Sequence, residues 1–320
     1  MRKRIIGSYE GEEKGPLIIL IGGMHGNEPA GVKAIDLFLK MLEVEPITNV
    51  DFKFKGKVVG IHGNLKAFNK GVRYFEKDLN RQFTKENVVR VNKAHADELD
   101  AEDHELKDLI HQVRHEIKEY QPTQLVILDI HTTSAQGGIF IIPAENNESE
   151  AIATKLEVPV VKGLLKGIFG TSLHYFIAEN TGVDTIGISF EAGQHDDPKS
   201  VNRAIAVIVN LMRHLKCIED TDVEHQHNKI LSDYSHNLPI TTELVYRHAI
   251  LSSDEFEMNP GYKNFQKVAI GEKLAKDKNG PILSKMDAYI LMPLYQKQGV
   301  DGFFFSSIKI EFFSKKFIFI

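Results

Sequence analysis

The sequence predicts an α/β protein in which helices flank a sheet of buried strands, with a smaller β domain after it. Apolar runs, unbroken at Leu17–Ile21 and interrupted by one aspartate at Leu125–Ile130, are typical of strands buried on both faces. Apolar residues at helical spacing follow such runs, as in Ala30–Val44. From residue 238 onward the sequence pattern changes to short runs of strand-forming residues, separated by turns that contain Gly, Asn and Asp. We therefore expect an α/β domain (1–220), a linker (221–237) and a C-terminal β domain (238–320).

The remaining elements follow from the same patterns, taken in chain order. A strand and a charged turn are expected over residues 1–16, and further buried strands at 55–63, 138–143 and 184–190. Residues 84–120 are mostly charged and helical, and residues 148–161 read as a weak helix that runs into a strand. Helices are also expected at 172–181 and 198–215.

Composition limits the function classes. The chain has 320 residues, 42% of them apolar, and a net charge of −5, so it lacks the basic surface of a nucleic-acid-binding protein. Cys217 is the single cysteine, which excludes an intrachain disulfide and a cysteine-based zinc site. The basic start, Met1–Arg4, has no apolar h-region after it, and no window is long and apolar enough to span a bilayer. We expect a cytoplasmic protein without a membrane partner.

The stretch Leu17–Gly31 carries the first candidate site. Gly22 and Gly23 end the buried strand, His25 and Glu28 follow, and Pro29 stands where a helix could begin. Open α/β sheets bind ligands at the carboxyl ends of their strands, and an imidazole with a carboxylate suits zinc. The alternative is a surface His beside a helix-start Glu. A catalytic zinc site needs a third protein ligand.

The strand Leu125–Ile130 offers that third ligand. His131 follows the strand, and Asp129 lies on the same strand face, where a carboxylate can orient a ligating ring. The alternative is a buried His bonded to Asp129 without metal. Glu191 follows the strand at 184–190, and there a carboxylate could take a proton from an activated water, or be an ordinary strand-end Glu.

An irregular polar segment, Gly71–Arg81, is expected beside this edge of the sheet. Arg73, Asn80 and Arg81 could recognise a carboxylate, because the planar guanidinium fork matches carboxylate geometry. The alternative is a solvated charged loop. Other histidines are weaker candidates: His111 and His115 lack the Glu of an HExxH motif, and a His-x-His pair in the linker (residues 225 and 227) is expected to face solvent.

Four motifs taken together resemble the aspartoacylase and succinylglutamate desuccinylase family, whose members are relatives of the zinc carboxypeptidases. They are GGMHGNEPAG, GVR…DLNRQF, DIHTTS and FEAG, in this order between residues 22 and 193, and MPLYQKQGVDGFFF resembles the family's C-terminal region. The resemblance implies a zinc-carboxypeptidase-like mixed sheet flanked by helices, with a C-terminal β domain that narrows the pocket.

The same resemblance implies roles for matching positions. One Zn²⁺ per chain is held by His25, Glu28 and His131, and Glu191 is the general base and proton shuttle. Arg73 polarises the scissile carbonyl, while Asn80 and Arg81 grip a substrate carboxylate. The implied reaction is hydrolysis of the amide bond of a small N-acyl amino acid.

The chain also departs from the family pattern. Aspartoacylase has a further arginine before the catalytic Glu, but residues 178–184 contain none, and the loop 296–301 has no tyrosine. N-acetylaspartate is therefore in doubt as the substrate. A carboxypeptidase acting on short peptides and a non-catalytic sensor of acyl amino acids remain alternative functions. The apolar tail Phe317–Ile320 is expected to be an edge strand or a contact within a homo-oligomer.

Overall fold

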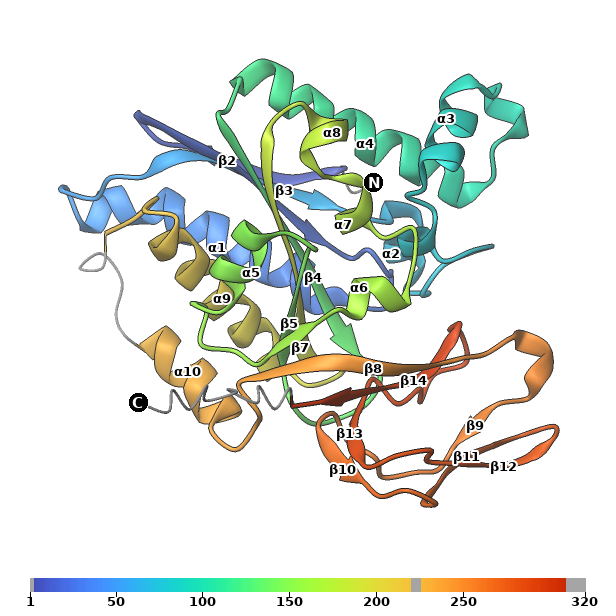
Figure 1. Ribbon diagram of the computed structural model, residues 1–320. Helices are drawn as coiled ribbons and strands as arrows, with labels where there is room; N and C mark the ends of the chain where they lie inside the picture. The colour runs from blue at the N-terminus through green and yellow to red at the C-terminus, as the bar shows by residue number, and fades with distance from the viewer. Residues whose placement is uncertain (1–2, 220–225, 309–320) are drawn as a thin grey trace, which may run out of the picture.

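The structure, a computed structural model, describes residues 3–219 and 226–308. A mixed sheet of eleven strands forms its centre (Figure 1). In spatial order its strands are β1 (Ile5–Glu10), β3 (Lys55–His62), β2 (Glu13–Gly22), β4 (Gln124–Thr133), β7 (Asp184–Gln194), β5 (Phe140–Pro143), β6 (Val160–Lys162), β8 (Thr241–Ala249), β14 (Asp301–Ser307), β13 (Ala288–Leu291) and β10 (Gln266–Val268).

The middle of this sheet is parallel, which places the candidate site. Strands β3, β2, β4 and β7 run in the same direction, and the pairings align Ile21 with Asp129 and His131 with Glu191. The carboxyl ends of β2, β4 and β7 therefore meet at one edge. Residues that follow or end these strands are brought together there although they lie far apart in the sequence.

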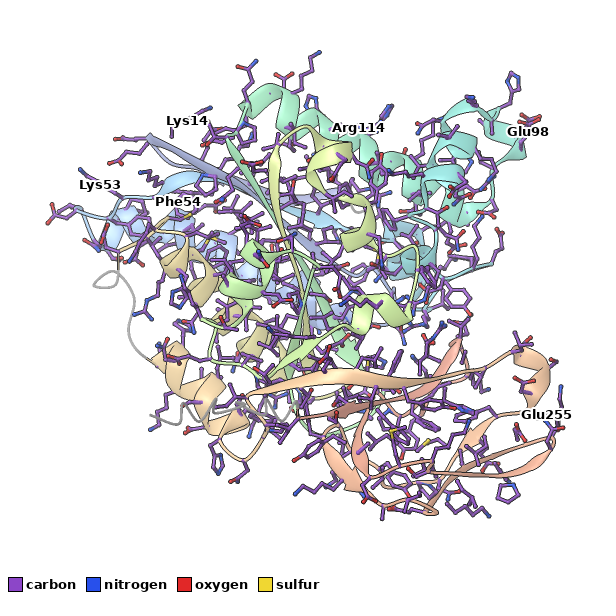
Figure 2. All side chains as sticks on the ribbon, in the orientation of Figure 1. Lys14, Lys53, Phe54, Glu98, Arg114 and Glu255 are labelled. Atoms are coloured by element: carbon purple, nitrogen blue, oxygen red, sulfur yellow. The ribbon has the colours of Figure 1, made fainter. Side chains whose placement is uncertain are left out.

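Helices cover both faces of the parallel strands. They are α1 (Pro29–Thr48), α2 (Leu65–Lys70), α3 (Lys85–Lys93), α4 (Ala101–Tyr120), α5 (Asn147–Ala153), α6 (Leu164–Gly167), α7 (Ser172–Tyr175), α8 (Ala178–Thr181), α9 (Lys199–His214) and α10 (Gln226–Ser235), with 3₁₀ turns η1 (Leu79–Arg81), η2 (Ala96–Glu98) and η3 (Ser252–Asp254). Charged side chains such as Lys14, Glu98 and Arg114 project from the periphery (Figure 2).

The apolar run of β2 fills two cores at once. Ile18 and Leu20 pack in the cluster that contains residues of α1 and α9, while Leu17, Ile19 and Ile21 pack in the cluster that contains residues of α4. All five side chains are fully buried. Full burial of one such side chain stabilises the fold by about 1.5–3 kcal/mol, so an unbroken apolar run is what this central position requires.

The strands after residue 238 extend the same sheet and also form a separate one. Strands β8, β14, β13 and β10 continue the large sheet, with antiparallel pairing from β8 onward. A three-stranded sheet of β12 (Gly280–Leu283), β11 (Lys273–Asp277) and β9 (Glu257–Met258) adds a third apolar cluster with β10, β13 and β14. The fold class is confirmed, and the domain limits at 220 and 238 stay a prediction.

Several predicted elements differ in detail. The helix expected at 172–181 is two short helices, α7 and α8, and the charged region 84–120 is divided into α3 and α4. Strand β4 extends to Thr133 and β7 extends to Gln194, so His131 and Glu191 lie inside their strands and not after them. The linker contains α10, and His227 in this helix is buried at 7% exposure, so the expectation that it faces solvent is wrong. Packing of α10 against α9 explains both findings, because α10 is held on the domain surface as an ordered element.

Two remaining expectations fall partly or wholly outside the described residues. His225 and the tail at residues 317–320 belong to segments that the structure does not describe. Among the residues that it does describe, every helix is too short or too polar to cross a bilayer.

Candidate metal centre and active site

The turn between β2 and α1 places His25 and Glu28 at the sheet edge. Gly23 has φ of +68°, a conformation that glycine adopts without strain, and a side chain on Gly26 would come within 2.1 Å of the Ala67 backbone. Helix α1 then begins at Pro29. Glu28 is the N-cap residue, but its side chain makes no capping bond, so its carboxylate is left to point into the site.

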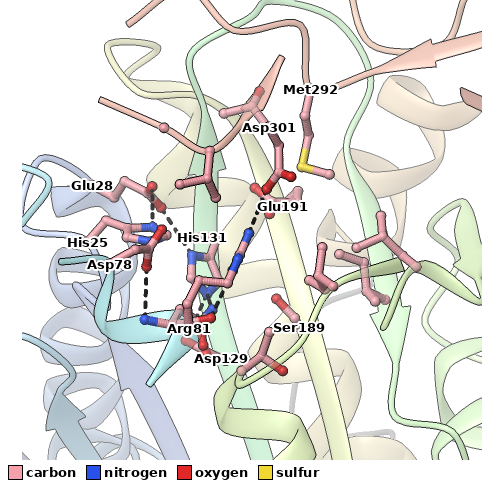
Figure 3. A pocket seen from close by; sticks show the side chains of 18 of the residues that line it. His25, Glu28, Asp78, Arg81, Asp129, His131, Ser189, Glu191, Met292 and Asp301 are labelled. Carbon is pink, nitrogen blue, oxygen red and sulfur yellow. Dashed lines mark hydrogen bonds and ion pairs between the residues drawn. The ribbon is translucent and has the colours of Figure 1, made fainter. Parts of the chain in front are cut away.

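His25, Glu28 and His131 converge there from two strand ends (Figure 3). The Nδ1 atom of His25 lies 2.8 Å from Glu28 Oε1, and Nδ1 of His131 lies 3.3 Å from Glu28 Oε2. One potential ligand atom from each residue lies within 4.8 Å of the others, and all three side chains are buried. Two donors about 2 Å from one ion are at most about 4 Å apart, and the separations of 2.8 and 3.3 Å from Glu28 meet that limit.

A buried aspartate contacts the second nitrogen of each ring. Asp78 Oδ1 lies 3.0 Å from Nε2 of His25, and Asp129 Oδ1 lies 3.1 Å from Nε2 of His131. Asp129 is itself held by the Ser172 hydroxyl, which donates to Oδ2 at 2.6 Å. In both rings Nε2 faces an aspartate carboxylate and Nδ1 faces Glu28. Carboxylates commonly fix the orientation of zinc-ligating histidines in this way. The donor set fits zinc.

The charges of these groups depend on one another. Burial is the largest single influence on the pKa of Glu28 and of Asp78, and it raises both. The opposing groups together outweigh it, namely His25 and His131 at Glu28, and His25 and Arg73 at Asp78, so both pKa values fall well below their usual range. Burial likewise lowers the pKa of His131, yet Asp129 and Glu28 raise it well above 6.5. A cation that binds His131 would therefore displace the proton that this raised pKa favours on the imidazole.

Glu191 supplies a carboxylate of a different kind. It is paired in register with His131 across β4 and β7, is 7% exposed, and its Oε2 is buried without a hydrogen-bond partner. Burial is the largest cause that raises its pKa, and His131 and Arg73 only partly oppose it, so the pKa of Glu191 is about 8. A carboxyl group with a pKa near neutrality is suited to exchange protons with a reactant.

Arg73 lies against the same cluster. Its Nη1 donates to Glu28 Oε1 and its Nη2 to Asp78 Oδ2, both at 3.2 Å. Its Nε is buried without a hydrogen-bond partner and is a free donor at the site. The segment predicted to flank the metal edge does so, since Gly26 N also donates to Arg73 O at 3.1 Å.

Asn80 and Arg81 belong to η1 and are already engaged by protein atoms. Asn80 Oδ1 accepts from Ser172 N at 2.9 Å, and its Nδ2 lies 3.5 Å from His131 Nε2. Arg81 Nη1 donates to Asn80 O at 2.8 Å, and its Nη2 donates to Asp301 Oδ2 at 2.8 Å (Figure 3). The structure places both residues in the site, and Arg81 is paired with the carboxylate of Asp301, a residue of the protein itself.

These groups line one cavity of about 120 Å³. The polar side is formed by the residues above. The opposite side includes residues from the loop between β13 and β14, which is tied to the end of β4, because Tyr295 N donates to Ser134 Oγ at 3.0 Å. The C-terminal part of the chain thus contributes to the cavity wall.

A second carboxylate group, Glu76, Asp100 and Glu102, is close enough to be considered as a metal site. Its oxygens are used within the protein: Glu102 accepts from the backbone nitrogens of residues 75 and 76, and Asp100 caps α4 and pairs with Lys77 at 2.5 Å. This arrangement supports loop and helix structure.

Sequence reasoning missed three contributors to the site: Asp78, Ser172 and Asp301. Asp78 lies two positions before Asn80 and caps η1, which was a usable signal. Ser172 and Asp301 carry no local pattern, because only the tertiary fold brings them to the cavity. His111 and His115 are exposed on α4, as predicted.

Comparisons with known proteins agree with this geometry. A family model described as the succinylglutamate desuccinylase/aspartoacylase catalytic domain matches residues 14–215. A probable aspartoacylase of Nostoc sp. is 33% identical over 125 residues, or 39% of this chain and 38% of that relative. Another, of Prochlorococcus marinus, is 27% identical over 214 residues, or 63% of each protein. The matches thus span less than two thirds of either relative.

The fold is also that of a solved structure. The crystal structure of succinylglutamate desuccinylase from Vibrio cholerae matches with a TM-score of 0.61 and 15% sequence identity, covering 92% of this chain and 81% of that chain. The likeness extends beyond the matched family region into the C-terminal strands.

Proposed function

Because the chain belongs to the succinylglutamate desuccinylase/aspartoacylase family, we propose that it is a zinc-dependent hydrolase that cleaves the amide bond of an N-acyl amino acid. The convergence of His25, Glu28 and His131 beside the buried carboxyl group of Glu191 is the observation that carries the proposal. Two oriented imidazoles and one carboxylate form the usual ligand set of a hydrolytic zinc site.

His25 and His131 would hold the zinc through Nδ1, and Glu28 through its carboxylate. When bound, zinc supplies Lewis acidity, which polarises a carbonyl and acidifies water. Asp78 and Asp129 keep both rings in the ligating orientation.

Glu191 acts as the proton carrier. It accepts a proton from the attacking water and passes the proton to the leaving amine nitrogen, which requires a pKa between those of the two partners. Its partner-free Oε2 supports this role. Arg73 donates to the oxygen on which negative charge develops, through a guanidinium that Glu28 and Asp78 hold in place. Asn80 and Arg81 bind a carboxylate of the substrate.

The proposal is tested by separating metal binding from turnover. We expect about one zinc per chain in protein purified without added metal, its loss in His25→Ala, and its retention in the control His111→Ala, which alters an exposed His on α4. Glu191→Gln should keep the zinc and lose hydrolysis. Full zinc content in His25→Ala would refute the ligand assignment, and unchanged turnover in Glu191→Gln would remove this residue from the mechanism.

A panel of N-acyl amino acids and short peptides tests the reaction class. Cleavage of N-acyl amino acids alone supports a deacylase, cleavage of peptides at the carboxyl end supports a carboxypeptidase, and binding without cleavage supports a sensor. We also expect a cytoplasmic location, which cell fractionation would check.

A further inference from the structure

We propose that Asp301 makes the pocket selective for N-acyl amino acids with one carboxylate and an apolar group, and against substrates with a second carboxylate. The inference deepens the proposed function and rests on it. It is carried by the contacts of Asp301, by the shortage of free cationic groups and by the apolar part of the cavity wall.

Asp301 is held in the pocket by two arginines. Its Oδ2 accepts from Arg81 Nη2 at 2.8 Å (Figure 3), and its Oδ1 accepts from Arg247 Nε at 2.5 Å. Arg247 is anchored in turn, because its Nη1 donates to Gly167 O at 3.0 Å. If Asp301 turned away, two partly buried guanidinium groups would lose the carboxylate between them. The side chain therefore stays where a substrate approaches Arg81.

The engagement of Arg81 limits what it can bind. Both terminal nitrogens of its fork have partners, Asn80 O and Asp301, while Nε is buried without one. Two arginines and one aspartate leave a single positive charge. That charge can balance one substrate carboxylate, whereas a second one would lie near Asp301 and be repelled.

No other cation is available for a second carboxylate among the described residues that line the cavity. Among the described residues of this lining, the lysine and arginine positions are Arg73 and Arg81. Arg73 already bonds Glu28 and Asp78. An additional anionic group of the substrate would therefore lose its hydration without gaining an ion pair.

Part of the cavity wall is instead apolar. It contains residues of the α6 region, of the loop between β13 and β14 and of β14: Leu164, Leu165, Ile168, Met292, Leu294 and Phe304. The whole cavity, polar side included, has a volume of about 120 Å³, which is below the volume of about 150 Å³ of a cavity that takes one benzene ring. A short apolar group therefore fits this wall better than a long fatty chain does.

The test uses substrate pairs that differ mainly in one carboxylate. N-acetyl-L-leucine against N-acetyl-L-aspartate varies the amino-acid side, and N-pentanoyl-L-leucine against N-succinyl-L-leucine varies the acyl side. We expect kcat/KM of the wild type to favour the monocarboxylate member at least about tenfold in one or both pairs, and Asp301→Asn to reduce that ratio at least about tenfold. Asp301→Glu and the control Asp254→Asn, which alters an aspartate paired with Lys278, should keep the ratio.

A ratio of rate constants is insensitive to a general loss of activity. If Asp301→Asn does not fold, Asp301→Ser replaces it, because the smaller side chain leaves room for water between the arginines. An unchanged ratio in the folded variant, or a wild type that prefers the dicarboxylate in both pairs, would overturn the proposal.

Calorimetric binding separates this inference from the proposed function. N-acetyl-L-leucine and N-acetyl-L-aspartate are titrated into zinc-loaded Glu191→Gln, with and without Asp301→Asn. If the wild type hydrolyses none of the four compounds, the hydrolase proposal fails. A binding preference for the leucine compound that disappears with Asp301→Asn would still support the role of Asp301, and equal binding of both compounds would refute it.

Discussion

Replacement of Asp78 by Asn tests whether the carboxylate behind His25 controls metal affinity. Asp78 is 5% exposed, and its Oδ1 lies 3.0 Å from His25 Nε2 and accepts from Asn80 N at 2.9 Å. Its Oδ2 accepts from Arg73 Nη2 at 3.2 Å. Asn has nearly the same shape but no charge, so the variant keeps the packing and changes the electrostatics.

The expected magnitude follows from these three contacts. A hydrogen bond to a charged group contributes about 1.5–3 kcal/mol, against about 0.5–1.5 kcal/mol for a neutral one, so loss of the charge at His25 costs about 1–1.5 kcal/mol of zinc binding. That energy corresponds to roughly a tenfold weaker affinity, within the range of 10–100-fold that is typical for partners of metal-ligating histidines. The buried Arg73 also loses an ion pair, so the metal-free variant should unfold about 1–3 kcal/mol more easily.

The assay is a competition titration of zinc against a coloured chelator, combined with denaturant unfolding. Asp103→Asn is the matched control, because Asp103 is equally buried and pairs with Lys77 but contacts none of the proposed ligands. We expect this control to lose stability and to keep the zinc affinity of the wild type. A folded Asp78→Asn protein whose zinc affinity stays within twofold of the wild type would refute the reasoning.

Three further predictions concern protons and charge at the same site. First, Asp129 and Glu28 raise the pKa of His131 in the metal-free protein, so zinc must displace the proton on this imidazole when it binds. The apparent affinity for zinc should therefore rise about tenfold per pH unit at pH values below that pKa, and a pH-independent affinity would contradict this. Second, the pKa of Glu191, about 8, lies above its unfolded value of about 4.5. Its contribution to the stability of the metal-free protein is therefore fully present below about pH 4.5 and is lost as pH rises through 8. The free energy of unfolding should fall by at most about 1.4 kcal/mol per pH unit for this reason, and urea unfolding of Glu191→Gln should lack this pH-dependent contribution. Third, Arg73→Lys should lower kcat by about 100-fold with zinc retained, because an ammonium group cannot bridge two carboxylates and also stabilise an oxyanion; kinetics equal to the wild type would exclude the role.

The sequence by itself determined the strands and the residues at their ends. An unbroken apolar run such as Leu17–Ile21 indicates a strand buried on both faces, and polar groups at the ends of parallel strands gather at one edge of the sheet. The placement of His25, Glu28 and His131 at this edge was predictable for this reason. Glu191 was found at nearly the right position, although β7 extends beyond it.

Only the tertiary structure decided which groups surround these residues and how charge is shared among them. Asp301 meets Arg81 across 220 residues of chain, and Ser172 meets Asp129 across 43. Such contacts arise from packing between elements and leave no periodic signal in the sequence. The same is true of the raised pKa of Glu191, because burial among other groups, and not residue type, sets it.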